Sequence, residues 1–351
     1  MIVDVLQTAS FTEIERVRKL LFPGQVLVEE GMEVHPSDVV AEAQVPSAIM
    51  MLDIANGLAL SPEETTACML REVDDILEEG DVIAQCEKKL PRLFRAPADG
   101  KIISYHQGGM VLATETSKIT ITANMIGIVK EIIPEYGVVL SSHGSVIQGY
   151  WGNGLSGSGV LKVLEASLDR PITVSMLGDM AQDQVIASCA CLDEDALDAC
   201  FENQISGLIL SALSTDLIEK VNALPFPVIV LHGFGEHSLA QDVFEIFQSH
   251  SEASISLNAC PVDYFDGERP EVIIPKDEGQ IARSLGFRKT LEVGDRVRIT
   301  SGKMFNQLGK VVELLEEGQV FENGVVMPAA IVKLQRLEKV KVSQHNLVVV
   351  G

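Results

Sequence analysis

Short apolar runs separated by turns dominate the first half of the chain. The clearest examples within residues 1–166 are QVLVEEGMEVHPSDVVAEA, DDILEEGDVIAQC, FRAPADGKIISYHQGGMVLAT and IGIVKEIIPEYGVVLSSHGSVIQGYWGNG. Each joins one apolar strand to another through a turn that contains glycine or proline beside acidic residues. This spacing is typical of a small all-β body. Residues 1–166 are therefore predicted to form a β-rich domain.

Three segments of this domain carry helical signals instead. SAIMMLDIANG predicts a helix over 47–57 that ends on Gly57 as its C-cap. SPEE at 61–64 is a capping box with proline at the first helical position, and it predicts a second helix. TEIE, which begins at residue 12, is another capping-box pattern, so a third helix is expected to run to about residue 21.

Residues 167–275 change to an alternation of strand-like and helix-like segments. In chain order these are PITVSML, DEDALDACFEN, GLILSAL, STDLIEKVNAL, PVIVLHG, SLAQDVFEIFQSH and ASISLNA. Strands that alternate with helices at this spacing form a parallel sheet, so the segment is predicted to be a small doubly wound α/β domain. Ligands of such domains bind beyond the carboxyl ends of the strands.

The junction HGFGEHSLAQ is the strongest candidate for such a ligand site. Gly233 and Gly235 lie in the turn, and Ser238 opens an S-x-x-Q capping-box pattern. A helix start after a glycine turn can hold an anion, so Gly233, Phe234, Gly235 and Ser238 are the candidate ligand-binding residues. Glu236 favours a neutral or singly charged ligand over a phosphate. An ordinary turn is the alternative interpretation.

Charge is distributed unevenly along the 351 residues, whose formal net charge is −23. Residues 1–166 carry 12 basic and 23 acidic side chains, and residues 167–275 carry 3 and 18. Residues 276–351 carry 12 and 9, and a basic connector lies at 283–289. Because nucleic-acid affinity depends on neutralising phosphates, the first two segments disfavour DNA or RNA as a partner.

No motif in the sequence predicts catalysis, a metal or a cofactor. The six cysteines include no CxxC pair, and the chain contains no G-x-S-x-G, HExxH or phosphate-loop lysine. His232, Glu236 and His237 do not have the spacing of a regular zinc site. No apolar run is long enough to span a membrane, and the N-terminus does not have the pattern of a signal peptide. A cytoplasmic protein without catalytic residues is expected.

The segment GDRVRITSGKMFNQLGKVVEL, which begins at Gly294, resembles the KOW module of NusG-type bacterial transcription elongation factors and of some ribosomal proteins. After a hairpin tip at 315–328, AAIVKLQRLEKVKVSQHNLVVVG resembles the remaining strands of that module. The resemblance implies an SH3-like barrel within residues 276–351, preceded by a linker. The residues that carry the resemblance are Gly294, Asp295, Val297, Ile299, Gly302, Phe305, Gly309, Val311 and Val312.

The turn phrases EEGMEVHPSDVVA and LEEGDVIA resemble the barrel-sandwich hybrid fold of biotinyl and lipoyl domains, a fold that also occurs in the large subunits of bacterial RNA polymerase. A carrier domain of this kind needs a lysine beside methionine or aspartate at a hairpin tip. The lysines in this region lack such neighbours, so a swinging-arm function is not expected; they are Lys88, Lys89, Lys101, Lys118, Lys130 and Lys162.

These observations together favour a non-catalytic adaptor or scaffold, associated by fold analogy with the transcription or translation machinery. SH3-like barrels bind RNA in some families and proteins in others, and the weak net charge of the barrel favours a protein partner. The candidate docking residues are Lys303, Met304 and Phe305, in an exposed loop. Phe305 could equally belong to the barrel core. The barrel is expected to fold alone, without a strand from residues 1–270.

Two alternatives come from other functional classes. The α/β domain could make the protein a small-molecule sensor or an enzyme, with the Gly233–Gly235 turn as its site. The barrel could instead bind RNA through a basic groove formed by Arg296, Arg298, Lys303 and Lys310.

Overall fold

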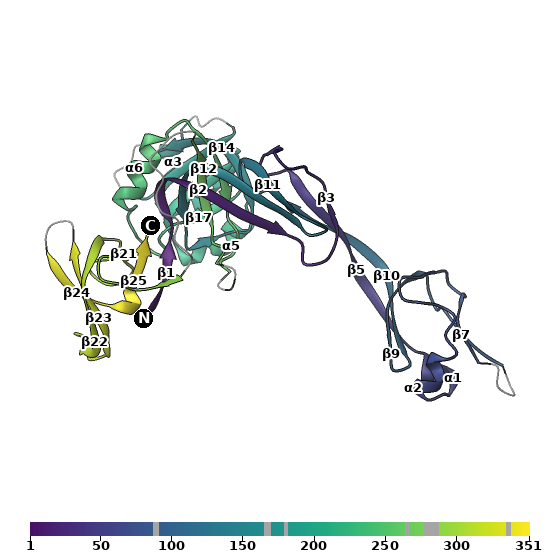
Figure 1. The fold of residues 1–351 in the computed structure, drawn as a ribbon. Coiled ribbons are helices and arrows are strands. Elements are labelled where there is room, and N and C mark those ends of the chain that lie inside the picture. Colours follow the sequence, from purple (N-terminus) through teal and green to yellow (C-terminus); the bar gives the residue numbers. More distant parts are fainter. Residues whose placement is uncertain are drawn as a thin grey trace.

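The protein is a multidomain, β-rich molecule with 51% strand and 13% helix. A central body lies between a smaller C-terminal sheet and a long two-stranded arm that ends in a distal module (Figure 1). The computed structural model describes residues 1–86, 91–164, 170–178, 182–263, 265, 267–276, 288–334 and 338–351. Most of the basic connector, residues 283–287, lies outside the described residues, as do Lys88 and Lys89.

The central body is built on a mixed sheet. Its strand order is β13-β17-β16-β15-β14-β18-β19-β12-β11-β4, and β2 also pairs with β12. The strands are β2 (Thr8–Lys19), β4 (Glu33–Val34), β11 (Gly127–Ile133), β12 (Gly137–Gln148), β13 (Trp151–Gly152), β14 (Ser156–Val163), β15 (Gln184–Cys191), β16 (Gly207–Leu213), β17 (Val228–Val230), β18 (Ser254–Asn258) and β19 (Glu271–Pro275).

Only part of this sheet is parallel. The neighbours from β14 to β17 run parallel, whereas β18 pairs antiparallel with both β14 and β19. The sheet also continues across residue 166, because β14 and β15 are adjacent. The parallel strands that were expected are therefore one part of a larger mixed sheet.

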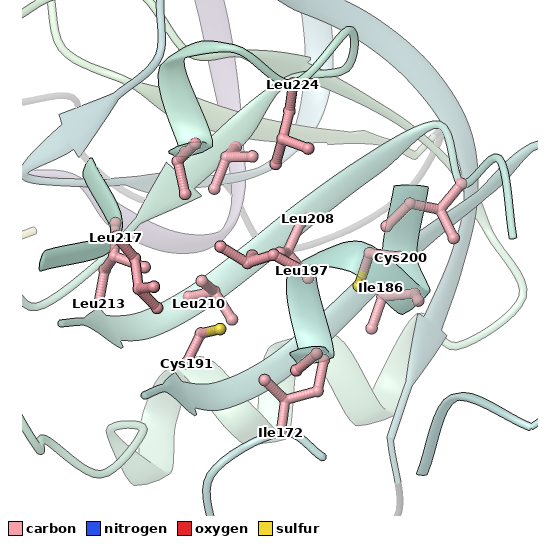
Figure 2. Close-up of a cluster of buried hydrophobic side chains, with 14 of the residues drawn as sticks. Ile172, Ile186, Cys191, Leu197, Cys200, Leu208, Leu210, Leu213, Leu217 and Leu224 are labelled. Atoms are coloured by element: carbon pink, nitrogen blue, oxygen red, sulfur yellow. The ribbon is translucent and has the colours of Figure 1, made fainter. Parts of the chain in front are cut away.

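Helices cover both faces of the parallel strands. On β16, Leu208 and Leu210 face one core and Ile209 faces the other, as the period-two geometry of a strand requires. Figure 2 shows the first core, where Leu197 and Cys200 of α4 pack on these strands. The helices are α3 (Val174–Leu177), α4 (Glu194–Glu202), η1 (Thr215–Leu217) and α5 (Ile218–Asn222), with α6 (Gln241–Ser249) packed against the second core.

The helix expected from residue 12 is wrong. Residues 8–19 form strand β2, which pairs antiparallel with β12 over most of its length. Ile14 and Arg18 are both buried on one face of this strand. The capping-box pattern TEIE is a local signal, and the pairing with β12 together with the burial of this face overrides it.

The C-terminal sheet includes a strand from the N-terminus. Its order is β20-β1-β25-β21-β22-β23-β24, and β1 pairs antiparallel with β20 and parallel with β25. Val3 and Val5 belong to the core of this sheet. The expectation that the C-terminal unit needs no strand from residues 1–270 is therefore wrong. The strands are β1 (Ile2–Leu6), β20 (Arg288–Thr290), β21 (Arg296–Ile299), β22 (Leu308–Val320), β23 (Val326–Leu334), β24 (Lys339–Ser343) and β25 (Leu347–Val350), with η2 (Gln344–Asn346) before β25.

Two long antiparallel strands form the arm. The pairing of β5 with β10 continues from Val39 opposite Thr122 to Asp53 opposite Gly109. Figure 1 shows this ribbon leaving the central body and entering a distal module. We define this module as residues 49–113, where the paired strands begin to face its core. The strands are β3 (Gln25–Val26), β5 (Val39–Asp53), β6 (Ile76–Leu77), β7 (Val82–Cys86), β8 (Arg92–Arg95), β9 (Gly100–His106) and β10 (Gly109–Thr122).

The two helices of the distal module were predicted with different success. The helix expected over 47–57 is wrong for most of its length, because β5 continues to Asp53 and α1 (Ile54–Leu58) is short. Its C-cap is Ala59 rather than Gly57. The capping box of α2 (Pro62–Thr66) is confirmed, with Ser61 accepting from the Glu64 amide and proline in the first turn.

Candidate functional site

The candidate ligand loop lies at the carboxyl end of β17, but its backbone is already used within the chain. The Gly235 amide donates to the Leu213 carbonyl at 2.9 Å, and the Leu213 amide donates to the Gly233 carbonyl at 3.3 Å. Phe234 packs edge-on against Trp151. Both glycines have φ of +103°, in the left-handed region that explains the residue type. The loop therefore extends the sheet by one bridge.

Ser238 does not cap α6. The helix begins after Ala240, and no side chain makes the capping hydrogen bond. Beneath the loop, buried His232 accepts a hydrogen bond from the Ala240 amide through Nε2 at 3.2 Å. The capping box expected at Ser238 is therefore wrong. Instead, the imidazole of His232, which follows the preceding strand, accepts a hydrogen bond from one of the amides that have no partner within the helix.

His232 is held in its neutral form. Burial lowers its pKa well below the ordinary value, and the charges of Arg298 and His237 lower it further. Because Nε2 accepts a hydrogen bond, the ring proton is placed on Nδ1, which has no partner. The ring acts as a structural acceptor that supports the loop.

Two side chains from neighbouring strands hold the same loop from the other side. The Ser211 hydroxyl and the Cys189 thiol both donate to the His237 carbonyl, the thiol at 3.7 Å. Both residues are buried at the carboxyl ends of β16 and β15. These polar groups lie where α/β domains place ligands, but here they are directed at the chain's own backbone.

The candidate docking loop contacts the candidate ligand loop. The rings of Phe305 and His237 stack with centroids 4.0 Å apart, and Asn306 Nδ2 donates to the Ser238 carbonyl at 3.0 Å. Met304 packs against the core of the C-terminal sheet, whereas Lys303 is exposed. Two surfaces that the sequence indicated separately thus form one junction between the C-terminal sheet and the central body.

A partly buried ion pair strengthens this junction. Arg298 Nη2 donates to both carboxylate oxygens of Asp242, at 3.1 and 3.0 Å, and Arg296 approaches the same carboxylate at 3.6 Å. Asp242 lies in the first turn of α6, where an acid is favoured by the helix dipole. Of the four cations proposed for an RNA groove, Arg298 is buried and Arg296 faces this carboxylate, while Lys303 and Lys310 remain exposed.

The distal module carries a different kind of surface. Leu52, Ile102 and Leu112 face its core. On the opposite face, Ile49 lies across from Ala113 in the strand register, and Met51 lies across from Val111. Directly paired residues project to the same side of a sheet.

The same row continues across the whole distal sheet. Ala113 lies opposite Lys101, which in turn lies opposite Ile76. Met51, Ile76 and Ile49 are 81%, 79% and 61% exposed. We call Ile49, Met51, Val111 and Ile76 the outer face, and it surrounds Lys101, which pairs with Asp74 at 2.7 Å.

The sequence interpretation missed the outer face because it assigned 47–57 to a helix. The run AIMML contains too many apolar residues in succession to show which of them face outward. The signal that could have revealed it is the match between the lengths of β5 and β10, which shows only when the two strands are paired.

Comparison with protein-family models and with curated proteins found no match for this chain. Among the described residues, no group of three or more His, Cys, Asp and Glu side chains is arranged to hold a metal ion. In the same part of the chain, no helix has the length and apolar character needed to cross a membrane.

Proposed function

We propose that this protein is a non-catalytic adaptor whose arm presents the outer face to a protein partner. The observation that carries the proposal is the row of exposed apolar side chains on one face of the distal sheet, with the module's own core on the opposite face. A sheet normally buries at least one face, and exposed apolar side chains gathered on the second face mark an interaction surface. Met51 and Ile76 are its most exposed members.

The charge of the distal module indicates what the partner surface is like. Residues 49–113 contain 11 acidic and 6 basic side chains. Within the outer face, Lys101 is already paired with Asp74. A partner with an apolar patch bordered by basic residues would match both features, since complementary charge steers association and excludes wrong partners.

The finer fold assignments support the same class of function. In the C-terminal sheet, β21 to β24 pair in sequence, and after η2 the last strand returns to pair with β21. This order fits an SH3-like barrel of the KOW type, to which β1 is added. Together with the turn phrases in residues 1–166 that resemble a barrel-sandwich hybrid, and with the parallel α/β part of the central body, it favours an adaptor of the transcription or translation machinery, by fold analogy alone.

The test combines partner identification with a direct affinity measurement. Proteins that co-purify with the full chain from its native cell are identified, and the purified partner is titrated against wild type and against Met51→Ser/Ile76→Ser. We expect binding by the double variant to be at least about tenfold weaker, because two apolar anchors are lost. Leu21→Ser, at an equally exposed leucine on the central body, is the matched control and retains wild-type affinity.

Circular dichroism of both variants verifies the fold. A partner that binds the folded double variant as tightly as wild type would show that the outer face is not the docking surface. Recovery of nucleic acid alone, bound through the C-terminal sheet, would replace the adaptor with an RNA-binding function.

A further inference from the structure

A polar cavity of about 770 Å³ lies along β2, away from both loops discussed above. This is within the usual volume of small-molecule sites, roughly 300–1,000 Å³. Four cations line it: Arg16, Arg18 and Lys19 come from β2, and Arg269 comes from the segment before β19. They gather here although the whole chain has a net charge of −23 and residues 167–275 contain only three basic side chains.

Arg18 is the central residue of this cavity. Its side chain is 6% exposed, Nε donates to the Ala123 carbonyl at 2.9 Å, and Nη1 donates to Glu268 at 3.1 Å. The remaining nitrogen, Nη2, is buried and has no hydrogen-bond partner. A buried guanidinium donor without an acceptor is costly, so a site that leaves one open is suited to receive an acceptor from a ligand.

The other two arginines, Arg16 and Arg269, already form ion pairs that hold their side chains in place along the cavity. Arg16 forms two parallel hydrogen bonds with Glu271, at 2.8 and 2.5 Å, and Arg269 donates to Asp4 at 3.0 Å. Burial opposes the charge of Arg16, but the pair with Glu271 outweighs it and raises the pKa of Arg16. These pairs fix the cavity before any ligand arrives, which reduces the ordering cost of binding.

Nearby acids limit the charge of the ligand. Glu15, Glu268 and Glu271 line the same cavity, and the Glu268 side chain is 45% exposed. Burial together with Glu268 and Glu271 raises the pKa of Cys260 to about 12, so this residue stays a neutral thiol and does not balance Arg18. A dianionic phosphate would be repelled by these carboxylates, whereas a ligand with a single carboxylate needs only one donor, the unpaired Nη2 of Arg18.

We propose that this cavity binds a small polar molecule through one carboxylate group, which accepts a hydrogen bond from Arg18 Nη2. Asn124, Gln148 and Asn258 line the remainder of the cavity and supply amide groups for a polar ligand body. This site is distinct from the loop at Gly233–Gly235 and is independent of the adaptor function of the arm.

The probe is N-acetylglycine, which combines one carboxylate with an amide, titrated calorimetrically against the full chain. We expect saturable binding below about 10 mM, the range of a weak fragment. Arg18→Gln should weaken binding at least about tenfold, because a charge-assisted hydrogen bond is lost. Glu268→Gln removes a competing carboxylate from Arg18 and should tighten binding roughly fivefold.

Glu268→Gln keeps the test decisive if Arg18→Gln fails to fold, because Glu268 is half-exposed. Glu252→Gln is the matched control, since Glu252 is an exposed glutamate that pairs with Lys162 of β14, and β18 and β19 separate β14 from β12, the partner of β2. Absence of binding by wild type, or an affinity unchanged by Glu268→Gln, would overturn the proposal. Inorganic phosphate binding more tightly than N-acetylglycine would overturn the choice of a carboxylate.

Discussion

The two ends of this molecule are attached to the central body in opposite ways. The C-terminal sheet contains β1, the strand that directly precedes β2 of the central body, and it is fixed by the Arg298–Asp242 pair and the Phe305–His237 stack. In the part of the chain that the structure describes, the distal module is joined to the body through β5 and β10, whose middle residues are exposed on both faces. One end is integrated with the body, and the other is presented away from it (Figure 1).

This contrast indicates where interaction surfaces should be sought. Of the three candidate docking residues in the C-terminal sheet, Met304 packs on the core of that sheet and Phe305 stacks on His237, so the apolar side chains of this loop are used inside the chain. The presented end leaves Met51 and Ile76 exposed, although a second sheet face of this kind is usually covered. The way in which a region is attached to the central body therefore predicts whether its apolar surface is free to bind a partner. It does so better than the amino-acid composition of a single loop.

Removal of β1 should have the largest effect, and it tests whether the C-terminal sheet is integrated with the central body. Deleting residues 1–7 removes Val3, Val5 and Leu6 from the protein interior, and burial of three such side chains contributes about 5 kcal/mol. We expect the C-terminal sheet to unfold, and residues 276–351 expressed alone to be unfolded for the same reason. Amide-proton NMR dispersion of the fragment measures this, and fusion of residues 1–7 to its C-terminus through a flexible linker, parallel to β25, should restore the dispersion. A folded fragment without β1 would contradict the integration.

The second largest effect concerns the ion pair at the junction. Asp242→Asn leaves the guanidinium of Arg298 buried without its counter-charge, which should cost about 3 kcal/mol of unfolding free energy. Urea denaturation measures the loss. Glu252→Gln, which breaks an exposed pair with Lys162, is the control and should change stability by less than about 0.5 kcal/mol. Equal effects of the two substitutions would show that the junction contributes nothing.

Sequence reasoning succeeded where the determining signal is local. The capping box of α2 is read from four consecutive residues, and the strand at residues 207–213 is read from one short, mostly apolar run. It failed for residues 12–21 and 47–57, where pairing with β12 and β10 overrides a helical pattern. Pairing partners far along the chain cannot be read from a single segment.

The same limit applies to the sites. The turn at Gly233–Gly235 was recognised as a turn at a strand end, but its hydrogen bonds to Leu213 were not visible in the sequence. The cavity along β2 needs Arg16 and Arg18 on one strand face and Glu271 255 residues away. A helical assignment of residues 12–21 would have placed the two arginines on different faces.

A smaller effect comes from His232, which lies inside the junction. Its folded pKa is far below the ordinary value near 6.5, so the unfolded chain binds the extra proton first as the pH falls. Stability should therefore decrease below about pH 6.5, by up to about 1.4 kcal/mol per pH unit. Urea denaturation between pH 7.5 and pH 5.5, on the order of two pH units, measures the slope. His232→Gln should flatten it, and an unchanged slope in that variant would assign it to another group.

The smallest expected effect is on the stability of the central body when the distal module, the presented end, is removed. Val45 and Ser117 lie directly opposite each other on β5 and β10, so residues 46–116 can be replaced by an Asn-Gly turn that closes the ribbon. Because the distal module has its own core and, among the described residues, is connected to the body through the ribbon, the unfolding free energy of the body should change by less than about 0.5 kcal/mol.

The same variant separates the two proposed functions. Loss of the arm should abolish binding of the protein partner, because the outer face is gone, while N-acetylglycine should still bind the cavity along β2 with wild-type affinity. Urea denaturation and calorimetry of one protein preparation give both results. If the central body loses stability or its cooperative unfolding transition in this variant, the arm is a structural part of the body. The distal module would then be integrated with the body in the same way as the C-terminal sheet.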